Sequence, residues 1–298
     1  MDLRSLRYFT AVAEERHFGR AAARLRITQP PLSRAIRQLE TDLGALLLHR
    51  SPAGVTLTEA GTALYEEARA LLEHAEHARA RVTAAAGTAT FTIGILSDSA
   101  EDTNSALADA FRQRNPKVVV HVRQADLTDP TTGLRAGLAD VALTRAPFDS
   151  TGISTRVLRS DPVGVVLRAG ERVVGPQDDP LAGRDTLLLD DLGGRPWFQL
   201  PAGTDPLWRA YWGGTRPGER AREGPVVRTV AECVQGALWS GVVGIAPVSH
   251  ALPQGLAIVP VADLPPSRLV VAWNSTDANP LIRSFIQVAA MAYRSHRA

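Results

Sequence analysis

The sequence of 298 residues contains one cysteine, Cys233. A single thiol excludes an intrachain disulfide and a zinc site made of several cysteines. Cys233 lies in an apolar helical pattern, so we interpret it as a packed residue, with a redox sensor as the alternative. His17 and His49 have no partners at metal-ligand spacing, and we interpret both as structural.

Long hydrophobic runs are also missing. No stretch approaches the roughly 18 apolar residues that a membrane-spanning helix needs. The first residues, Met1–Arg4, lack the basic segment and following apolar segment of a secretory signal. These absences predict a cytoplasmic protein without a membrane partner.

The motifs that accompany common catalytic chemistries are absent as well. We find no glycine-rich phosphate loop, no nucleophile elbow and no HExxH pair, and Gly241–Gly244 supplies only a short Gly-x-x-Gly. We therefore predict no catalytic residue, no metal and no fixed cofactor. An enzyme remains the remote alternative.

Lysine is nearly absent, and arginine is concentrated at one end of the chain. The formal net charge is only +2, yet residues 1–57 hold nine arginines against five acidic residues. A basic end on a nearly neutral body predicts that this end binds a polyanion. A solvated charged face would give the same composition, so the prediction needs a motif.

The N-terminal segment has the spacing of three short helices. Apolar residues at 3–4 spacing predict a helix over residues 3–14, and a second helix is expected over residues 19–25. A third helix should start at Thr28, whose hydroxyl can cap the first turn, with Pro30 and Pro31 tolerated there. Its predicted buried stripe is Leu32, Ile36, Leu39 and Leu43.

The other side of this third helix carries hydrogen-bonding and cationic side chains. Arginine can bind guanine bidentately, glutamine can bind adenine, and serine reaches a base or a phosphate. This face therefore has the chemistry for base edges and phosphates in a DNA groove. Its residues are Gln29, Ser33, Arg34 and Arg37.

A tight turn follows the third helix. Residues 51–54 read Ser-Pro-Ala-Gly, and residues 55–57 form a short apolar strand. A hairpin in this position is a wing that normally contacts the sugar-phosphate backbone or the minor groove. Arg50 lies at its base. The alternative is a helical core with an exposed arginine face that binds no DNA.

Together these residues resemble the N-terminal signature of LysR-type transcriptional regulators over about sixty positions. The matching residues are Ala21-Ala22, Leu25, Gln29-Pro30, Leu32-Ser33-Arg34, Ile36, Leu39-Glu40, Leu43-Gly44, Leu48, Arg50, Leu57-Thr58 and Ala60-Gly61. Two positions depart mildly from the family pattern, with Thr28 where serine is commoner and Pro31 where alanine is commoner.

The resemblance implies a winged helix-turn-helix whose third helix faces double-stranded DNA. It implies that Gln29, Pro30, Ser33, Arg34 and Arg37 lie on the DNA-facing side, and that Arg50 and Thr58 approach the DNA backbone. With the helix start, the expected DNA-binding residues are Thr28, Gln29, Pro30, Pro31, Ser33, Arg34, Arg37, Arg50 and Thr58.

Residues 58–86 form a long helical pattern without proline. Apolar and small residues repeat every seven positions from Leu57 to Val82, which is typical of a helix that packs along a partner helix. We therefore expect a homodimer, and in the family this segment is the dimerising linker helix. Two-fold symmetry predicts an inverted-repeat operator. A homotetramer and contact with RNA polymerase are further expectations.

Within this helix, Glu73-His74-Ala75-Glu76-His77 leaves a second interpretation open. Two histidines three residues apart could share a metal ion, although a solvated polar face is the simpler interpretation. We predict no metal here.

Beyond residue 90, predicted strands and helices alternate. The rhythm predicts a parallel sheet with right-handed crossovers. Two strands around Asp161-Pro162 predict a crossover into a second lobe, and the C-terminal helix returns to the first. We predict an α/β fold with three segments: residues 1–58 for DNA binding, 59–88 for dimerisation and 89–298 for effector binding. Lobe I comprises 89–161 and 268–298, and lobe II comprises 162–267.

The family resemblance continues more loosely through this region. It rests on Phe91–Leu96, Gly137–Leu143, Trp197–Pro201 and Gly241–Pro247, which look like the family's two-lobed effector-binding domain, similar to a periplasmic binding protein. A small-molecule co-inducer of unknown identity is therefore expected between the lobes.

Ligand groups in α/β folds lie after the carboxyl ends of strands. The expected effector-binding residues are Ser97, Asp98, Ser99, Thr128, Thr144, Arg145, Leu200, Pro201, Ala202, Val230 and Val243. The resemblance independently implies the positions of Ser97–Ser99, Thr128 and Pro201. Each polar residue could instead be a helix cap or turn residue. Arg145 could bind a carboxylate, but nearby aspartates oppose an anion, so no ligand class is assigned.

The sequence thus predicts a sequence-specific transcription regulator that responds to a small molecule. A DNA-binding regulator without an effector remains the nearer alternative, and it shares every feature of the N-terminal segment.

Overall fold

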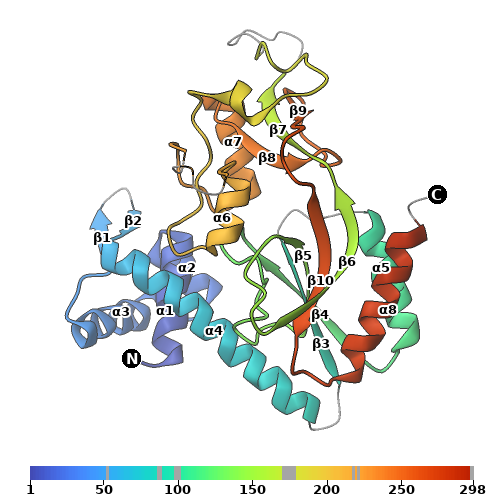
Figure 1. Cartoon of the computed structure of the whole chain (residues 1–298). Coiled ribbons are helices and arrows are strands. Elements are labelled where there is room, and N and C mark those ends of the chain that lie inside the picture. Colours follow the sequence, from blue (N-terminus) through green and yellow to red (C-terminus); the bar gives the residue numbers. More distant parts are fainter. Residues whose placement is uncertain are drawn as a thin grey trace. The chain divides into compact units, whose positions relative to one another are not determined.

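The computed structural model of the chain describes residues 1–51, 54–85, 89–96, 102–169, 179–216, 219 and 222–295 (Figure 1). Its contacts divide the chain into two compact units, Met1–Gly87 and Thr88–Ala298. Each unit has its own hydrophobic core.

The first unit consists of helices and one hairpin. Its elements are α1 (Leu3–Glu15), α2 (Phe18–Arg24), α3 (Gln29–Leu43), β1 (Leu48–Ser51), β2 (Gly54–Leu57) and α4 (Glu59–Ala85). The Asp2 carboxylate accepts a hydrogen bond from the Ser5 amide at 2.7 Å and starts α1 as part of a capping box. Strands β1 and β2 pair antiparallel, which confirms the predicted hairpin.

The start of α3 differs from the prediction. Thr28 is the N-cap residue, but its hydroxyl makes no capping hydrogen bond. An N-cap side chain normally accepts from the amide of the second or third helical residue, and here these are Pro30 and Pro31, which have no N–H. The prolines therefore begin the helix and also remove the donors that Thr28 would have capped.

The buried stripe of α3 is shorter than predicted. Leu32, Ile36 and Leu39 are at most 1% exposed, whereas Leu43 is 42% exposed. The helix ends directly after Leu43 at Gly44, which has a positive φ of 65°. The additional buried residue on this helix is Glu40, which is polar and was not predicted to be buried.

The long helix α4 packs its first half against the core of the unit. Ala68 is fully buried, and Leu64 and Leu72 pack beside it. Gly61 is required at the first contact, because a Cβ there would lie 2.0 Å from the Leu47 carbonyl oxygen. Further along, Leu71 is 45% exposed and Val82 is 71% exposed. Part of the predicted apolar seam is thus uncovered in one chain.

In the second unit, lobe I contains a five-stranded sheet in the order β4-β3-β5-β10-β6. Its elements are β3 (Thr90–Leu96), α5 (Asp102–Arg114), β4 (Val119–Ala125), β5 (Val141–Ala146), β6 (Ile153–Asp161), β10 (Ser267–Asn274) and α8 (Pro280–Ser295). Helices α5 and α8 pack side by side (Figure 1) over a core that contains Phe91, Phe111 and Phe285.

The expected parallel sheet is found only in part. Strand β3 is parallel to β4 and β5, but β10 is antiparallel to β5 and β6. The cause is the connection between lobes: β6 leaves the sheet for lobe II and β10 returns from it, so the two strands run in opposite directions. The alternation of strands and helices also predicts a short helix at Gly133–Gly137, and this prediction is wrong. Thr132, Gly133 and Gly137 have positive φ and form turns instead.

Lobe II contains an antiparallel sheet in the order β8-β7-β9. Its elements are β7 (Val163–Arg168), a 3-10 helix η1 (Leu189–Leu192), α6 (Pro206–Trp212), α7 (Val230–Ser240), β8 (Gly244–Pro247) and β9 (Leu256–Pro260). The alternation of strands and helices predicts a strand over residues 226–230, and this prediction is wrong. Val226 makes an isolated bridge to Gln199, and Val230 begins α7 after a Thr229 cap.

Two segments connect the lobes, as the sequence predicted. Strand β6 ends at Asp161 and β7 begins at Val163, and the return runs from Pro260 to Ser267. Asp161 and Ser267 are partners in the register of β6 and β10. Both are buried, at 5% and 0% exposure, so polar side chains occupy the base of the connection.

Candidate DNA-binding surface and sensor region

The outward face of α3 presents the residues that the sequence placed there. Gln29, Pro30, Arg34 and Arg37 are exposed, and Pro31 and Ser33 are partly buried. Within the described residues, the guanidinium groups of Arg34 and Arg37 form no ion pair. The opposite face of the helix is anchored in the core, so these side chains are held outward on a rigid element.

Glu40 connects this helix to the hairpin. One carboxylate oxygen of Glu40 accepts hydrogen bonds from the amides of Leu47 and Leu48, at 3.1 and 3.3 Å. The other accepts from the Arg50 guanidinium at 3.1 Å. Glu40 is 8% exposed, so its charge is compensated by these donors rather than by water. The wing is therefore fixed relative to α3 by a polar contact inside the unit.

Arg50 has two structural partners. Besides the ion pair with Glu40, its guanidinium lies over the Phe18 ring, 5.0 Å from the centroid. The side chain remains 35% exposed. A guanidinium held by a carboxylate and an aromatic face has little rotamer freedom, so Arg50 projects from a defined place at the base of the wing.

Thr58 acts as a local cap. Its hydroxyl donates to the Leu46 carbonyl at 2.7 Å and accepts from the Gly61 amide at 2.9 Å. These bonds hold the start of α4 against the chain that leads into β1. The structure thus gives Thr58 a structural role, and its approach to DNA stays a prediction.

Sequence reasoning missed Arg16 and Arg20, and it assigned no particular contact to His17. The ring nitrogen Nδ1 of His17 accepts from the amides of Gly19 and Arg20, at 3.0 and 3.3 Å, and caps α2. Together with Gln29, Arg50 and neighbouring hairpin residues, these three line a cavity of about 280 Å³. The basic pair flanking His17-Phe18-Gly19 is the sequence signal that could have indicated it.

In the second unit, the predicted effector-binding residues Ser97, Asp98 and Ser99 lie outside the described residues. The loop after β4 is described and is built from two similar turns. Asp126 accepts hydrogen bonds from the amide and hydroxyl of Thr128, and Asp129 accepts from the amide and hydroxyl of Thr131. Asp126 and Asp129, two of the aspartates near Arg145 that argue against an anionic ligand, thus have local partners, and Thr128 donates within its own turn.

Thr144 and Arg145 also have partners inside the protein. Thr144 is 1% exposed, and its hydroxyl donates to the Pro130 carbonyl at 2.6 Å. Arg145 donates to the Asp161 carboxylate at 2.8 Å and to Ser267 at 3.4 Å. The Arg145 side chain, 12% exposed, thus compensates a buried aspartate at the lobe connection, and its contact with a ligand carboxylate stays a prediction.

Asp161 accepts from a second arginine as well. The Arg159 side chain donates to both carboxylate oxygens, at 2.6 and 3.0 Å. Two guanidinium groups around one buried carboxylate hold the end of β6 in place. This network joins β5, β6 and β10 where the chain passes between lobes.

The lobe II residues separate into two environments. Leu200 is 9% exposed and belongs to a core cluster with Phe198, Trp208 and Val227, while Pro201 and Ala202 follow it at higher exposure. Val243 is 2% exposed and belongs to another cluster, around Trp197. Val243 is therefore a core residue of lobe II, and Val230 is a partly buried residue of α7.

Several contacts bring the predicted strand ends of the two lobes together. The cluster around Leu200 also contains Leu96 and Leu127, which directly precede Ser97 and Thr128. The Leu127 carbonyl accepts from the Trp208 indole at 2.8 Å, and the Leu127 amide donates to the Arg228 carbonyl at 2.8 Å. The region chosen from the sequence is thus one where lobe I and lobe II meet.

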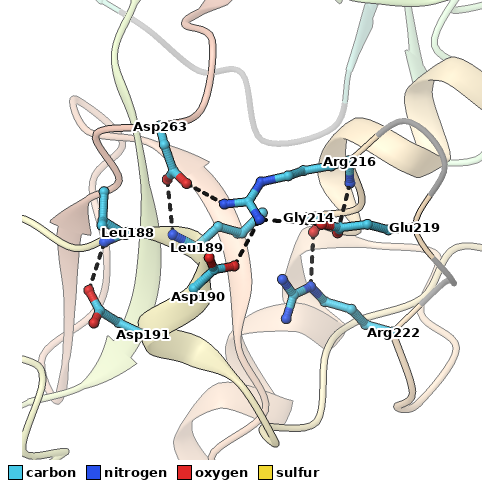
Figure 2. Close-up of polar contacts among 9 residues, drawn as sticks. All are labelled: Leu188, Leu189, Asp190, Asp191, Gly214, Arg216, Glu219, Arg222 and Asp263. Carbon is cyan, nitrogen blue, oxygen red and sulfur yellow. Dashed lines mark hydrogen bonds and ion pairs between the residues drawn. The ribbon is translucent and has the colours of Figure 1, made fainter.

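A charged network holds the return segment of lobe II (Figure 2). Arg216 contacts Asp190 at 2.8 Å, Asp263 at 2.5 Å and Glu219 at 3.3 Å. Asp263 lies between β9 and β10, and its other oxygen accepts from the Leu189 amide at 2.9 Å. In the same segment, the Pro265 carbonyl accepts from the Tyr211 hydroxyl at 2.7 Å. Helix α6 and the loop after it therefore hold the connection between the lobes through hydrogen bonds and an ion pair.

The pKa values of two groups in this region shift because of these surroundings. Burial raises the pKa of Tyr211 to about 12, so the phenol stays protonated as a donor. The hydrogen bonds that Arg216 donates to Asp263, then to Asp190 and Glu219, raise the pKa of Arg216 above its ordinary value.

Neither a group of metal ligands nor a membrane-spanning helix occurs among the described residues. Among them, no three histidine, cysteine, aspartate or glutamate side chains are grouped so that they could hold a metal. The side chains of Glu73, Glu76 and His77 lie outside that set. None of the described helices combines the length and apolarity of a membrane span.

Two family models match the chain, one in each unit. "Bacterial regulatory helix-turn-helix protein, lysR family" matches residues 3–62, and "LysR substrate binding domain" matches residues 84–294.

Relatives of known name support the same assignment. The chain is 30% identical to the Hca operon transcriptional activator HcaR of Escherichia coli over 97% of both chains. It is 28% identical to the regulator BudR of Raoultella terrigena over 97% of this chain and all of that one. The match to AlsR of Bacillus subtilis is 32% identical and spans 66% of this chain and 63% of that protein.

Solved structures share the fold. A C206 mutant of Corynebacterium glutamicum OxyR is 25% identical with a TM-score of 0.54, covering 99% of this chain and 92% of that chain. CbnR, a LysR family transcriptional regulator, is 23% identical with a TM-score of 0.56, covering 98% and 99%.

Proposed function

Because this chain belongs to the LysR family of bacterial DNA-binding transcription regulators, we propose that it binds an inverted-repeat operator as a homodimer and that a small molecule bound in its second unit alters this binding. One observation carries the DNA-binding part. Helix α3 buries Leu32, Ile36 and Leu39 and presents Arg34 and Arg37 outward without ion-pair partners among the described residues.

We assign base contacts to the middle of this face. Gln29, Ser33, Arg34 and Arg37 project from successive turns of a helix that fits a major groove. Thr28, Pro30 and Pro31 set where the helix begins. We assign Arg50 and Thr58 to contacts with the sugar-phosphate backbone of the DNA. The rigid Glu40–Arg50 contact supports this assignment, because helix and wing then meet DNA as one body.

Dimerisation is assigned to α4. A 27-residue helix is about 40 Å long, and its outer part leaves Leu71 and Val82 exposed at positions of the seven-residue repeat. A second copy would cover them. We propose the segment boundaries 1–58, 59–88 and 89–298 on this basis, with lobe I at 89–161 and 268–298 and lobe II at 162–267. A dimer of dimers follows if two such pairs bind neighbouring sites.

The effector site is assigned to the meeting point of the lobes, near Ser97–Ser99, Thr128, Pro201 and Ala202. The packing of Leu96 and Leu127 in one hydrophobic cluster with Leu200 supports this placement. Arg145 is engaged by Asp161, so we assign no organic acid as the ligand class. Ligand binding would shift the angle between lobes and thereby the DNA-bound form of the dimer. We further propose that the protein is cytoplasmic, because its target DNA lies in the cytoplasm. We also propose that it has no catalytic activity.

Operator binding tests the DNA-binding proposal. Footprinting of the full chain on the region upstream of its own gene should show an inverted-repeat protected site. Arg34→Ala should lower operator affinity by about 1–3 kcal/mol and relax base preference at one position. Wild-type affinity for Arg34→Ala would show that the assigned register of α3 is wrong.

Thermal-shift screening of metabolites tests the sensing proposal separately. A true effector raises the unfolding temperature in a concentration-dependent way. It should also change the footprint between half-sites. A chain that binds its operator but responds to no metabolite would be a regulator without an effector.

A further inference from the structure

The cavity of about 280 Å³ in the first unit lies beside the outward face of α3. Its lining comes from three places: the junction of α1 and α2, the first residue of α3, and the hairpin β1–β2. The lining residues that matter here are Arg16, His17, Arg20, Gln29, Arg50 and Ser51. None of the described residues that line the cavity carries a carboxylate.

The cations of this cavity are only partly neutralised. Within the described residues, the Arg16 side chain forms no ion pair. Arg20 is 63% exposed and has one acidic partner, Glu15, at 3.6 Å. Arg50 is paired with Glu40. Three guanidinium groups around one concave surface make a positive potential that attracts an anion.

His17 adds an N–H donor of fixed orientation. Its Nδ1 accepts from the Gly19 and Arg20 amides, so the proton of the neutral ring is on Nε2. An Nε2–H group can donate to an oxygen anion. The backbone bonds that cap α2 therefore also fix the tautomer of a residue that lines the cavity.

The walls of the cavity are already held in place. Arg16 has a φ of 50°, and its carbonyl accepts from the Val55 amide of β2 at 3.1 Å. Arg50 lies over Phe18, which links the hairpin to α2. A cavity with preformed walls does not need to order itself when an anion arrives, which favours binding.

We infer that this cavity binds one phosphodiester group of the DNA backbone, held by Arg16 and Arg20 with His17 as a donor. The inference rests on the proposed function, and it adds contacts that the sequence did not assign. Continuity favours DNA over a free anion, because Gln29 belongs both to the cavity and to the assigned base-contacting face. A phosphate bound here would fix how deeply α3 enters the groove.

The test measures how binding depends on salt. Arg16→Ala, Arg20→Ala and the double variant of the full chain are compared with the wild type on operator DNA and on a scrambled duplex. Each phosphate contact contributes about 0.9 to the slope of log affinity against log salt. We expect the double variant to lose about one unit of slope and roughly tenfold affinity near 0.1 M salt, equally on both duplexes.

Arg24→Ala provides the matched control. It removes an exposed arginine from the same helix, but Arg24 pairs with Glu14 at 2.6 Å and Glu15 at 3.3 Å and does not line the cavity. We expect its slope to equal that of the wild type. Thermal unfolding of all variants checks that each is folded.

Each remaining outcome has one meaning. An unchanged slope in the double variant overturns the inference, and a loss confined to operator DNA indicates a base contact instead. If inorganic phosphate at constant ionic strength stabilises the wild type at sub-millimolar concentration, and the double variant abolishes this without changing the DNA slope, the site binds free phosphate. If the wild type itself shows no operator preference, the proposed function fails rather than this inference.

Discussion

Glu40 of α3 accepts a hydrogen bond from Arg50 at the base of the wing, with 3.1 Å between Oε2 and Nη2. Its other oxygen accepts from two amides at the start of β1. One buried carboxylate therefore couples the helix proposed to read bases with the hairpin proposed to contact the backbone.

Glu40→Ala should detach the wing from α3. The change removes the acceptor for Leu47, Leu48 and Arg50, and we expect the first unit to lose about 1–3 kcal/mol of stability. Hydrogen exchange at the Leu47 and Leu48 amides is the direct measurement. Asp42→Asn, at an exposed ion pair of the same helix, should leave these amides protected. Unchanged protection in Glu40→Ala would contradict the role of Glu40.

Gly61→Ala distinguishes helix propensity from packing. Propensity alone predicts that alanine stabilises the helix by about 1 kcal/mol. The structure predicts the opposite, because a Cβ at residue 61 would lie 2.0 Å from the Leu47 carbonyl oxygen. We expect the free energy of unfolding of the first unit to fall by about 1–3 kcal/mol, measured by urea denaturation. Stabilisation by this change would mean that α4 does not contact residue 47 closely.

Asp161→Ala should destabilise the second unit. It leaves Arg145 and Arg159 without the carboxylate that they share, at a site where Asp161 is 5% exposed. Removing one partner from a buried ion pair costs about 3–5 kcal/mol. The unfolding temperature of the second unit should fall in Asp161→Ala. Asp149→Ala removes one partner of an exposed ion pair and should change this temperature little. Equal effects of the two changes would argue against a special role for Asp161.

Cys233 should be unreactive in the folded protein. Burial raises the pKa of its thiol to about 12, so the thiolate that reacts with alkylating agents and peroxide is scarce at neutral pH. We expect slow alkylation of the native chain at pH 8 and rapid alkylation in urea. Peroxide should leave operator binding unchanged. Complete labelling of the native chain within minutes would revive the redox-sensor alternative.

The contact between Asp263 and Arg216 should weaken in acid. Burial acts to raise the pKa of Asp263, but hydrogen bonds from the Leu189 amide and Arg216 outweigh it, so the pKa lies below 3.8. A carboxyl with a lowered folded-state pKa stabilises the protein above its unfolded pKa and loses this effect as the pH falls through the folded value. The difference in unfolding midpoint between wild type and Asp263→Asn should therefore be constant from pH 8 to about 4 and shrink below. A difference that grows as the pH falls below 4 would contradict a lowered pKa of Asp263.

Local spacing sufficed for much of the fold. The apolar repeat predicted the helices of the first unit and the length of α4, and Asp161-Pro162 marked the passage between lobes. It could not predict the direction of β10, because direction depends on where the chain returns from lobe II. It also missed that Pro30 and Pro31 deprive Thr28 of the amides it would cap, although both prolines are visible in the sequence.

The sequence by itself determined the chemistry of the helix proposed to face DNA, because periodicity decides which side chains share a face and which lie in the core. Only the tertiary structure decided which charges are available. It pairs Arg145 with Asp161 and Arg50 with Glu40, and it brings Arg16 and Arg20 to one cavity beside Gln29. The physical reason is that burial and ion pairing depend on residues distant in the chain, and spacing along the chain does not encode those distances.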